Sequence, residues 1–292
     1  MPRRPRSRSR AWRAERGVGA GVLLALPMML LVAALLVYPL GRLVTVALGP
    51  PHGFGNLAAF FDHPANTRVI RITFLDSALV TVLCLAVGAV VAWSLRVTER
   101  RANRLLLWTA MIVPFLMGSV LKLYAFTILL ESHGVVNGAL RLLGMADEPV
   151  ELLYNRFAVV LGLTYQMLPF AVLPLLAGFR TIDPELARAA EGLGAGRLRA
   201  VWDTVVPLAV PSLLATGTLV YIITLGFFLT PEVLGGPSSP FTASLIYQDV
   251  FEFYDVTSAA VSALVLLVGS LAVVGVGYWV VGRERLARAV AA

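Results

Sequence analysis

The sequence predicts an all-α integral membrane protein with six membrane-spanning helices. Three observations support this fold class. The chain is 58% hydrophobic and only 14% charged, whereas soluble domains are roughly half apolar and a quarter charged. The apolar residues gather into runs long enough to cross a hydrocarbon core of about 30 Å, which takes roughly 20 helical residues. The basic residues cluster beside these runs, as topology signals do.

The first predicted span covers about Val18–Leu48 and follows an arginine-rich tail, residues 1–17. A cleaved signal peptide has a shorter apolar core, so we interpret this run as a retained helix. Pro27 and Pro39 within it are compatible with a membrane helix. The other predicted spans are Phe74–Leu95, Leu105–Leu130, Phe157–Phe179, Val205–Leu229 and Thr257–Val281. The sequence therefore predicts a basic tail, 1–17, and one transmembrane domain, 18–292.

Arginine and lysine predict the orientation. Of the 24 basic residues, 18 lie in the tail, in the segments 96–104 and 180–203, and in the C-terminal tail. Because positive charge is retained on the cytoplasmic side, both termini are expected to be cytoplasmic. The alternate segments 49–72, 131–156 and 230–256 are more acidic and are expected outside. Their length and turn residues predict short helices along the outer surface.

Several functional classes are excluded by the residues themselves. The basic charge flanks apolar spans, which argues against nucleic-acid binding. Cys84 is the only cysteine, so no intrachain disulfide forms. The three histidines are far apart, and no catalytic or metal-binding motif occurs. The only lysine, Lys122, is followed by Leu123, so the chain has no nucleotide-binding P-loop. We therefore expect no enzymatic activity, no metal site and no bound cofactor.

The cytoplasmic segment 180–204 has a helix–glycine–helix pattern. Asp183 is suited to cap a helix and Pro184 to begin it. The apolar face of this helix comprises Leu186, Ala189, Ala190 and Leu193. Glycines at 192, 194 and 196 end it, and a second short helix is expected to carry Leu198, Val201, Trp202 and Val205 on one face and to end near Pro207. Such a face packs on the chain's own helix ends, lies among lipid headgroups, or docks into a soluble partner.

This segment resembles the cytoplasmic loop of binding-protein-dependent ABC importer permeases. That loop has Glu-Ala-Ala, three residues, Gly, nine residues, then Ile-x-Leu-Pro, and the matching residues here are Ala189, Ala190, Gly194 and Pro207. Arg188 stands where the family usually has Glu. Glu185 and Glu191 flank that position out of register, and Thr204 and Val206 replace Ile and Leu. The resemblance implies that residues 185–207 couple the permease to an ATPase.

Three further stretches are similar to the spermidine/putrescine-type permeases. They are Leu123–Phe126, Asn137–Tyr154 and Thr230–Pro237. With the loop, they imply a MetI-like permease in a bacterial inner membrane, which translocates a small polar solute, with a polyamine-like solute favoured. The implied partners are an external solute-binding protein, a second permease subunit and a separate ATPase dimer that uses ATP and Mg²⁺. A different related chain is favoured as the second permease, and a second copy stays open.

Two alternatives to this function remain. One is an ABC permease for another small solute, such as an amino-acid-like compound or a phosphonate. The other is a secondary transporter that needs no ATPase, which would show an internal repeat with paired broken helices.

Polar residues at membrane depth are candidates for the translocation pathway, because ionisable groups there are costly. The candidates are Asp76, Lys122, Tyr124, Tyr165, Gln166, Thr230 and Glu232. Lys122 faces the pathway, pairs with a carboxylate such as Asp76, or extends to the outer interface, and we favour the ion pair. Asp76 is equally suited to cap a helix. For Tyr124, Tyr165 and Gln166, a hydrogen bond between helices is the simpler interpretation.

Overall fold

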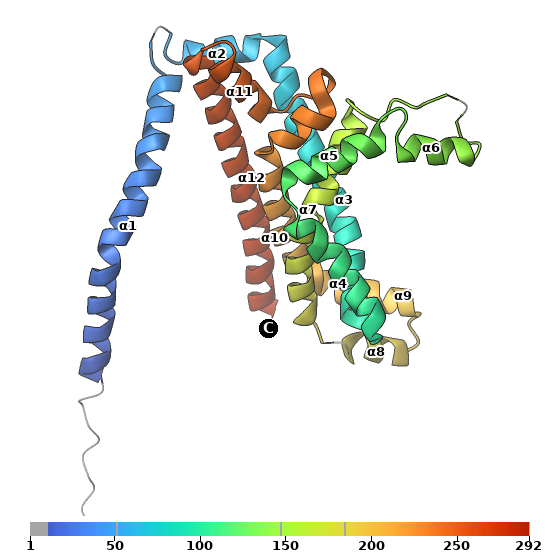
Figure 1. The fold of residues 1–292 in the computed structure, drawn as a ribbon. Helices are drawn as coiled ribbons and strands as arrows, with labels where there is room; N and C mark the ends of the chain where they lie inside the picture. The colour runs from blue at the N-terminus through green and yellow to red at the C-terminus, as the bar shows by residue number, and fades with distance from the viewer. Residues whose placement is uncertain (1–10, 51, 147, 184, 292) are drawn as a thin grey trace, which may run out of the picture.

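The computed structural model describes residues 11–50, 52–146, 148–183 and 185–291, and every regular element within these ranges is a helix (Figure 1). The all-α prediction is therefore confirmed. Residues 1–10 of the basic tail, Asp147 and Pro184 lie outside the described residues, as do the side chains of the C-terminal arginines. Helix α1 (Ala11–Ala47) already begins within the segment 1–17.

Six helical stretches of the described chain are long and apolar enough to cross a membrane, which confirms the predicted number. They are Leu26–Ala47, Pro64–Val97, Ser119–Leu142, Arg156–Arg180, Trp202–Leu225 and Val256–Trp279. They fall in α1, α3 (Pro64–Val97), α5 (Ser119–Leu130) with α6 (Val135–Leu142), α7 (Arg156–Arg180), α10 (Val206–Leu225) with the turn before it, and α12 (Val256–Ala291).

Helix α3 begins at Pro64, well before the predicted start at Phe74. Proline is favoured in the first turn of a helix, where its missing N–H would have no partner. The polar residues that follow Pro64 do not prevent helix formation, although they end the apolar run on which the prediction rested.

The third crossing is not the predicted continuous helix Leu105–Leu130. It is divided into α4 (Arg101–Leu116) and α5, with Met117 and Gly118 in extended conformation between them. Pro114 removes a backbone donor from the last turns of α4, and glycine is a poor helix former. Hydropathy does not register such a break, because both halves are equally apolar.

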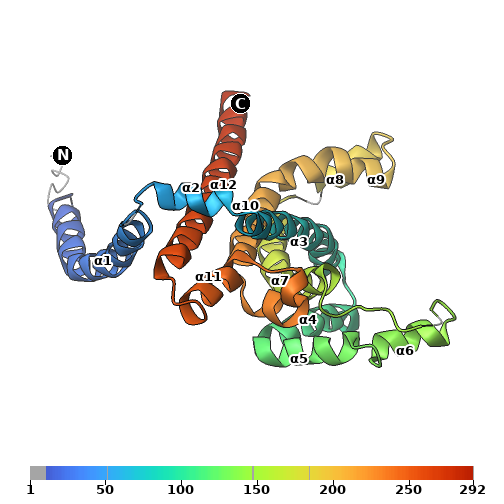
Figure 2. The same ribbon diagram turned by 90° about the horizontal axis from the view of Figure 1, so that it is seen from above.

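Helices α4 and α5 together run along α7 in antiparallel order. Phe115 of α4 lies edge-on to Phe170, with ring centroids 5.6 Å apart. Leu130, at the end of α5, belongs to the same core cluster as Val159 near the start of α7. We therefore assign the third crossing to α4 and α5. Helix α6 projects sideways from the bundle (Figures 1 and 2).

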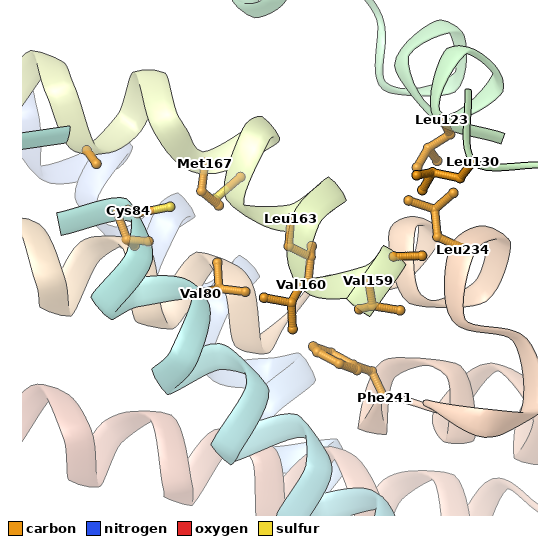
Figure 3. Packing of buried hydrophobic residues seen from close by; sticks show 13 residues of the cluster. Val80, Cys84, Leu123, Leu130, Val159, Val160, Leu163, Met167, Leu234 and Phe241 are labelled. Carbon is orange, nitrogen blue, oxygen red and sulfur yellow. The ribbon is translucent and has the colours of Figure 1, made fainter. Parts of the chain in front are cut away.

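Helix α7 is the most buried of the candidate spans and packs between α3 and α10. In the half of α7 that begins at Arg156, the core cluster runs from Val159 and Val160 beside Phe241, past Leu163, to Met167 beside Cys84 of α3 (Figure 3). Helices α3 and α7 approach closely at Gly88, where an added Cβ would lie 3.2 Å from that of Ala171. Small residues at such contacts let membrane helices pack tightly.

Helix α1 stands apart from the bundle over most of its length (Figures 1 and 2). None of its apolar window is buried. Only its end packs on the rest of the chain, where Ala47 meets Phe60 of α2 (Gly55–Asp62) and Val261 of α12. The long apolar side chains of α1 are thus available to lipid or to another subunit.

The short elements gather at the two ends of the bundle. At one end lie α2, α6, α11 (Thr242–Phe251), the π-helical turn η2 (Pro231–Gly235) and the 3₁₀ turn η3 (Gly236–Ser238), which confirms the short helices predicted for the outer segments. At the other end lie α8 (Glu185–Gly192), α9 (Arg197–Ala200) and the π-helical turn η1 (Val201–Val205). The described ends of α1 and α12 lie at this second end (Figure 1).

Candidate functional site

The segment between α7 and α10 begins with the predicted capped helix. The Asp183 side chain accepts a hydrogen bond of 2.9 Å from the backbone N–H of Glu185, at the second position of α8. This bond satisfies one of the unpaired donors of the first turn. The sequence prediction of Asp183 as the cap is confirmed, and a short turn after Arg180 connects α7 to α8.

Gly194 ends α8 with a Schellman motif. The backbone N–H of Ala195 donates to the carbonyl of Ala190 at 3.1 Å, and that of Gly194 donates to the carbonyl of Glu191 at 3.0 Å. Gly194 has a φ of +91°, a conformation that L side chains rarely adopt. The φ angles of Gly192 and Gly196 are not positive, so Gly194 is the glycine that this turn requires.

The apolar face of α8 is only partly covered by the described part of the chain. Leu193 is 91% exposed, and Leu186 and Ala189 are also exposed. Packing on the chain's own helices, one of the three interpretations of this face, accounts for only part of it, because α8 contacts α9 and η1 and Ala190 is half-buried. An exposed apolar face next to charged residues is typical of a surface that binds something else.

Arg188 lies on α8 and pairs with a glutamate of the same helix. Its guanidinium is 2.6 Å from the Glu185 carboxylate, and both side chains are largely exposed. An exposed pair of this kind contributes little to stability. It does place a carboxylate next to the position where the family has its glutamate.

The second helix of the segment differs from the prediction. Instead of ending near Pro207, α9 continues through η1 into α10. A π-helical turn shifts the hydrogen-bond register, which lets the helix pass the proline ring. Trp202 is 63% exposed while Val205 is buried, so these two residues do not share one face. The side chains of Leu198 and Val201 lie outside the described residues.

Arg96 connects the end of α3 to the end of α7. The sequence did not predict this contact, because Arg96 was counted only among the basic residues that predict orientation. Its guanidinium donates a hydrogen bond to the carbonyl of Ile182 and lies 5.2 Å from the ring centroid of Trp93. Ile182 belongs to the core cluster of Phe179 and Val205. The base of α8 is therefore held on the bundle by buried contacts.

Asp76 is fully buried and pairs with Arg156, not with Lys122. Arg156 Nε and Nη2 lie 2.6 Å and 2.5 Å from Asp76 Oδ1. The suggested Asp76–Lys122 pair was therefore wrong. Arg156 is the first residue of α7, and Asp76 faces it from α3 across the most extensive helix contact of the bundle. Sequence reasoning counted Arg156 as a loop charge because it precedes the apolar run.

Lys122 instead lines a cavity of about 410 Å³ between α5, α7 and α10. Gln166 of α7 lies in the same cavity and donates to the hydroxyl of Ser119 at 3.3 Å. Gln166 also accepts a hydrogen bond of 3.3 Å from Thr230. The structure therefore brings together three of the predicted pathway residues, Lys122, Gln166 and Thr230. Ser119, at the helix break, was not predicted.

The other candidates lie elsewhere. Tyr124 is 67% exposed on the outer face of α5. Tyr165 packs on Phe126, with ring centroids 5.2 Å apart. Glu232 is exposed in η2, two residues beyond Thr230. Asp76 is held in the α3–α7 interface by its ion pair, so it does not line this cavity.

The turn η2 docks against α7 through two glycines. A Cβ on Gly162 would lie 2.5 Å from Leu234, and one on Gly235 would lie 2.6 Å from Val159. Leu234 itself is fully buried. Gly162 and Gly235 thus allow the segment after α10 to lie directly on α7, beside the Gln166–Thr230 hydrogen bond. Hydropathy alone carried no signal for this contact.

Two neighbouring carboxylates, Asp249 and Asp255, lie outside the spans, at the end of the bundle that holds α2 and α11. Burial and the neighbouring carboxylate of Asp255 raise the pKa of Asp249 in α11 to about 6. Asp255 caps α12 and accepts hydrogen bonds from the Ser258 backbone N–H at 3.0 Å and hydroxyl at 2.7 Å. These bonds hold the pKa of Asp255 below its usual value.

Comparison with known proteins shows which protein family this chain resembles. The sequence model of the family described as "Binding-protein-dependent transport system inner membrane component" matches residues 84–286. The spermidine/putrescine transport system permease protein PotB of Escherichia coli (strain K12) is 31% identical over 195 residues, which cover 66% of this chain and 70% of that protein. The putative 2-aminoethylphosphonate transport system permease protein PhnU of Salmonella typhi is 29% identical over 255 residues, 85% of this chain and 86% of that protein.

Solved structures show the same fold. A bacterial ABC transporter involved in the import of the acidic polysaccharide alginate has a chain that superposes with a TM-score of 0.74 at 19% identity, over 94% of this chain and 99% of that one. A chain of an inward-facing methionine ABC transporter superposes with a TM-score of 0.56 at 16% identity, over 74% of this chain and 94% of that one.

The Asp76–Arg156 pair is expected to stabilise the bundle. Arg156→Met leaves the Asp76 carboxylate buried without a partner and should cost about 2–4 kcal/mol. Asp76→Asn in the same chain should recover most of that loss. The measurement is the thermal midpoint of the detergent-solubilised chain. Arg141→Met, which alters an exposed arginine of α6, is the control; an equal loss in both single variants would contradict the role of the pair.

Asp249 should make stability depend on pH. Its pKa is raised from 3.8 to about 6 in the folded chain, so the folded state retains a proton that the unfolded state has lost. The resulting stability is present below pH 3.8 and is lost as the pH rises through about 6. Asp249→Asn should therefore flatten the change in thermal midpoint between pH 4.5 and 7. Glu252→Gln, on the same side of the molecule, should retain the native slope; an unchanged slope in Asp249→Asn would refute the assignment.

Proposed function

This chain belongs to the family of binding-protein-dependent transport system inner membrane components, and we propose that it forms part of the path by which a small polar solute enters the cell. It is the multi-pass permease subunit of an ABC importer in a bacterial inner membrane. The proposal concerns its partners, orientation and solute. An external binding protein delivers the solute, and a separate ATPase dimer uses ATP and Mg²⁺ to drive its import through this chain and a second permease subunit.

One observation carries the proposal for the ATPase partner. Helix α8 presents an apolar face that ends at the Gly194 turn, and three of its four residues, Leu186, Ala189 and Leu193, are exposed in the described chain. A short, capped helix of this kind fits a socket on a soluble subunit. The basic clusters of the sequence place the same end in the cytoplasm. Together, these features support residues 185–207, with Glu185, Arg188, Ala189, Ala190, Gly194 and Pro207, as the coupling segment.

A polyamine-like solute is the first candidate, because the relatives that are about 30% identical are permeases of spermidine/putrescine systems. A second candidate is an aminophosphonate, because the phosphonate permease that is similar to this chain matches 85% of it. Both solutes carry an ammonium group, and they differ in the anionic phosphonate. Selection between them is expected to rest largely on the binding protein.

We assign the cavity beside Lys122 and Gln166 to the pathway. Thr230 joins Gln166 to η2, the segment that the family resemblance places at the outer gate. In an alternating-access cycle, ATP binding would move α8 and rock the spans against the second permease, opening the path outward. Tyr124, Tyr165, Glu232 and Asp76 do not line this cavity, although Tyr165 is adjacent in sequence to Gln166 and Tyr124 is two residues from Lys122.

Complex formation and solute choice test this function together. The tagged chain, expressed from its native gene cluster, should co-purify with an ATPase and a second permease. In proteoliposomes with the cognate binding protein, it should import radiolabelled putrescine or spermidine only when ATP is present. Uptake of 2-aminoethylphosphonate instead would select the second candidate. Uptake by this chain alone, without an ATPase, would overturn the importer assignment.

Gly194→Trp tests the coupling segment. No atom lies within 4 Å of a Cβ at Gly194, so the protein should insert and fold. The φ of +91° disfavours any L side chain, and the new ring would alter the docking surface. ATP-driven uptake should fall about tenfold or more, while the chain is recovered in normal amounts. Gly196→Trp, at an open position without positive φ, is the matched control; normal uptake by Gly194→Trp would contradict the assignment.

A further inference from the structure

Lys122 is a buried cation without a counter-charge. Its side chain is 8% exposed. Among the described residues it makes neither a side-chain hydrogen bond nor an ion pair, although it lines the cavity with Gln166. Buried charges in proteins are almost always paired or hydrogen-bonded. The ammonium faces this cavity, where water or a polar group of another molecule has access to it.

The position of Lys122 makes the lack of a counter-charge energetically unfavourable. It lies in the first turn of α5, where the backbone N–H of Lys122 donates to the carbonyl of Gly118 at 3.2 Å. The N-terminal end of a helix disfavours a cation. The cavity also contains Gln166, near the middle of α7, so it lies deep in the bundle. Extension of the side chain to the membrane surface does not explain a side chain that is nine-tenths buried at this depth.

No carboxylate of the described chain is placed to pair with Lys122. Asp76 already holds Arg156. Glu131 lies nine residues further along the chain, about 13 Å along a helix axis. The amide oxygen of Gln166 accepts from Thr230, and its amide nitrogen donates to Ser119. Each of these groups bonds another neighbour, and among the described residues none of them bonds the Lys122 side chain.

The surface beside the cavity is uncovered. On the side of α4 and α5 that points away from the bundle, Leu116 is 75% exposed and Val120 is 60% exposed. Lipid would satisfy these apolar side chains, but a hydrocarbon core holds no anion for Lys122. A second membrane protein satisfies both requirements, because it brings apolar contact and a buried carboxylate to the same face.

We propose that the second permease subunit covers the α4–α5 face and pairs one of its carboxylates with Lys122. This inference rests on the proposed function, since it takes the two-subunit permease as given. It also assigns an interface role to the only lysine of the chain.

The symmetry of paired subunits indicates where that carboxylate lies. If the second subunit is a copy of this chain, a twofold axis makes each residue pair across the interface occur in both directions, and a related chain can keep the same arrangement at corresponding positions. Glu232 of this chain is exposed in η2, close to the Gln166–Thr230 hydrogen bond, and has no ion pair in the described chain. The partner residue that corresponds to Glu232, in the segment after its fifth span, is the expected counter-charge.

A carbodiimide cross-link tests the pair in the intact complex. An apolar carbodiimide such as dicyclohexylcarbodiimide activates a buried carboxylate as the O-acylisourea. The Lys122 amine then attacks the acyl carbon, forming an amide and releasing dicyclohexylurea. Because Lys122 is the only lysine, mass spectrometry should find one side-chain cross-link from this chain, to a carboxylate of the second permease. Lys122→Arg should retain the complex but lose the cross-link.

Charge reversal gives an independent readout. Lys122→Glu should reduce recovery of the second permease about tenfold or more, and replacing the cross-linked acid by lysine should restore it. Arg68→Glu, a reversal at an exposed arginine of α3, should leave recovery unchanged. A cross-link to another protein, or full recovery with Lys122→Glu and no cross-link, overturns the proposal.

Lys122→Met separates a subunit contact from a solute contact. Reduced recovery of the second permease supports the proposed pair. Normal assembly with loss of uptake overturns it and assigns the ammonium to an anionic group of the solute. Wild-type co-purification with the ATPase and ATP-driven uptake report on the proposed function itself, so failure of that function is distinguishable from failure of this pair.

Discussion

The close packing of α7 between α3 and α10 is the constraint on which the rest of the bundle depends. Apolar burial alone does not select neighbours in a membrane, where lipid is as apolar as leucine. Here, selection comes from small residues that permit contact and from the ion pair between the buried Asp76 and the partly exposed Arg156. Gly88 and Ala171 bring α3 against α7, and Asp76 with Arg156 fixes their relative level near the outer end.

The same helix connects the two candidate sites. At one end, α7 leads into Asp183 and α8, and Arg96 holds this junction to α3. Midway along it, Gln166 bonds to both Ser119 and Thr230. Farther out, Gly162 receives Leu234 of η2. A displacement of α8 therefore acts on an element that contacts the third crossing, the cavity and η2 through short, directional contacts.

Much of this architecture could be predicted from the sequence, because hydropathy and arginine distribution respond to the bilayer itself. Six spans, the short outer helices and the capped helix at Asp183 followed from these rules. The break at Gly118 did not, since a hydropathy window averages over a local change of backbone direction. The π-helical turn at Val201–Val205 was missed for a related reason: periodicity arguments assume 3.6 residues per turn.

Partners in space were the least predictable feature. Arg156 and Asp76 are 80 residues apart in the chain. The sequence instead suggested Lys122 as the partner of Asp76, because both residues lie within predicted spans. Only the packing of α3 on α7 shows that Arg156, at the start of α7, contacts the Asp76 carboxylate. Of the pathway candidates, Gln166 and Thr230 meet because η2 folds back onto α7, a contact that depends on glycines rather than on polar pattern.

The segment 185–207, proposed as the coupling segment, shows how a departure from a family pattern can be compensated in space. Arg188 occupies the position of the family glutamate, but Glu185 lies three residues earlier on the same helix face and holds the guanidinium at 2.6 Å. The carboxylate is thus displaced by about one turn. The backbone features are retained independently of it, because the Asp183 cap and the Gly194 turn define where α8 begins and ends. The shape of the docking helix therefore depends on its ends, and the charges on its surface are free to vary with the partner.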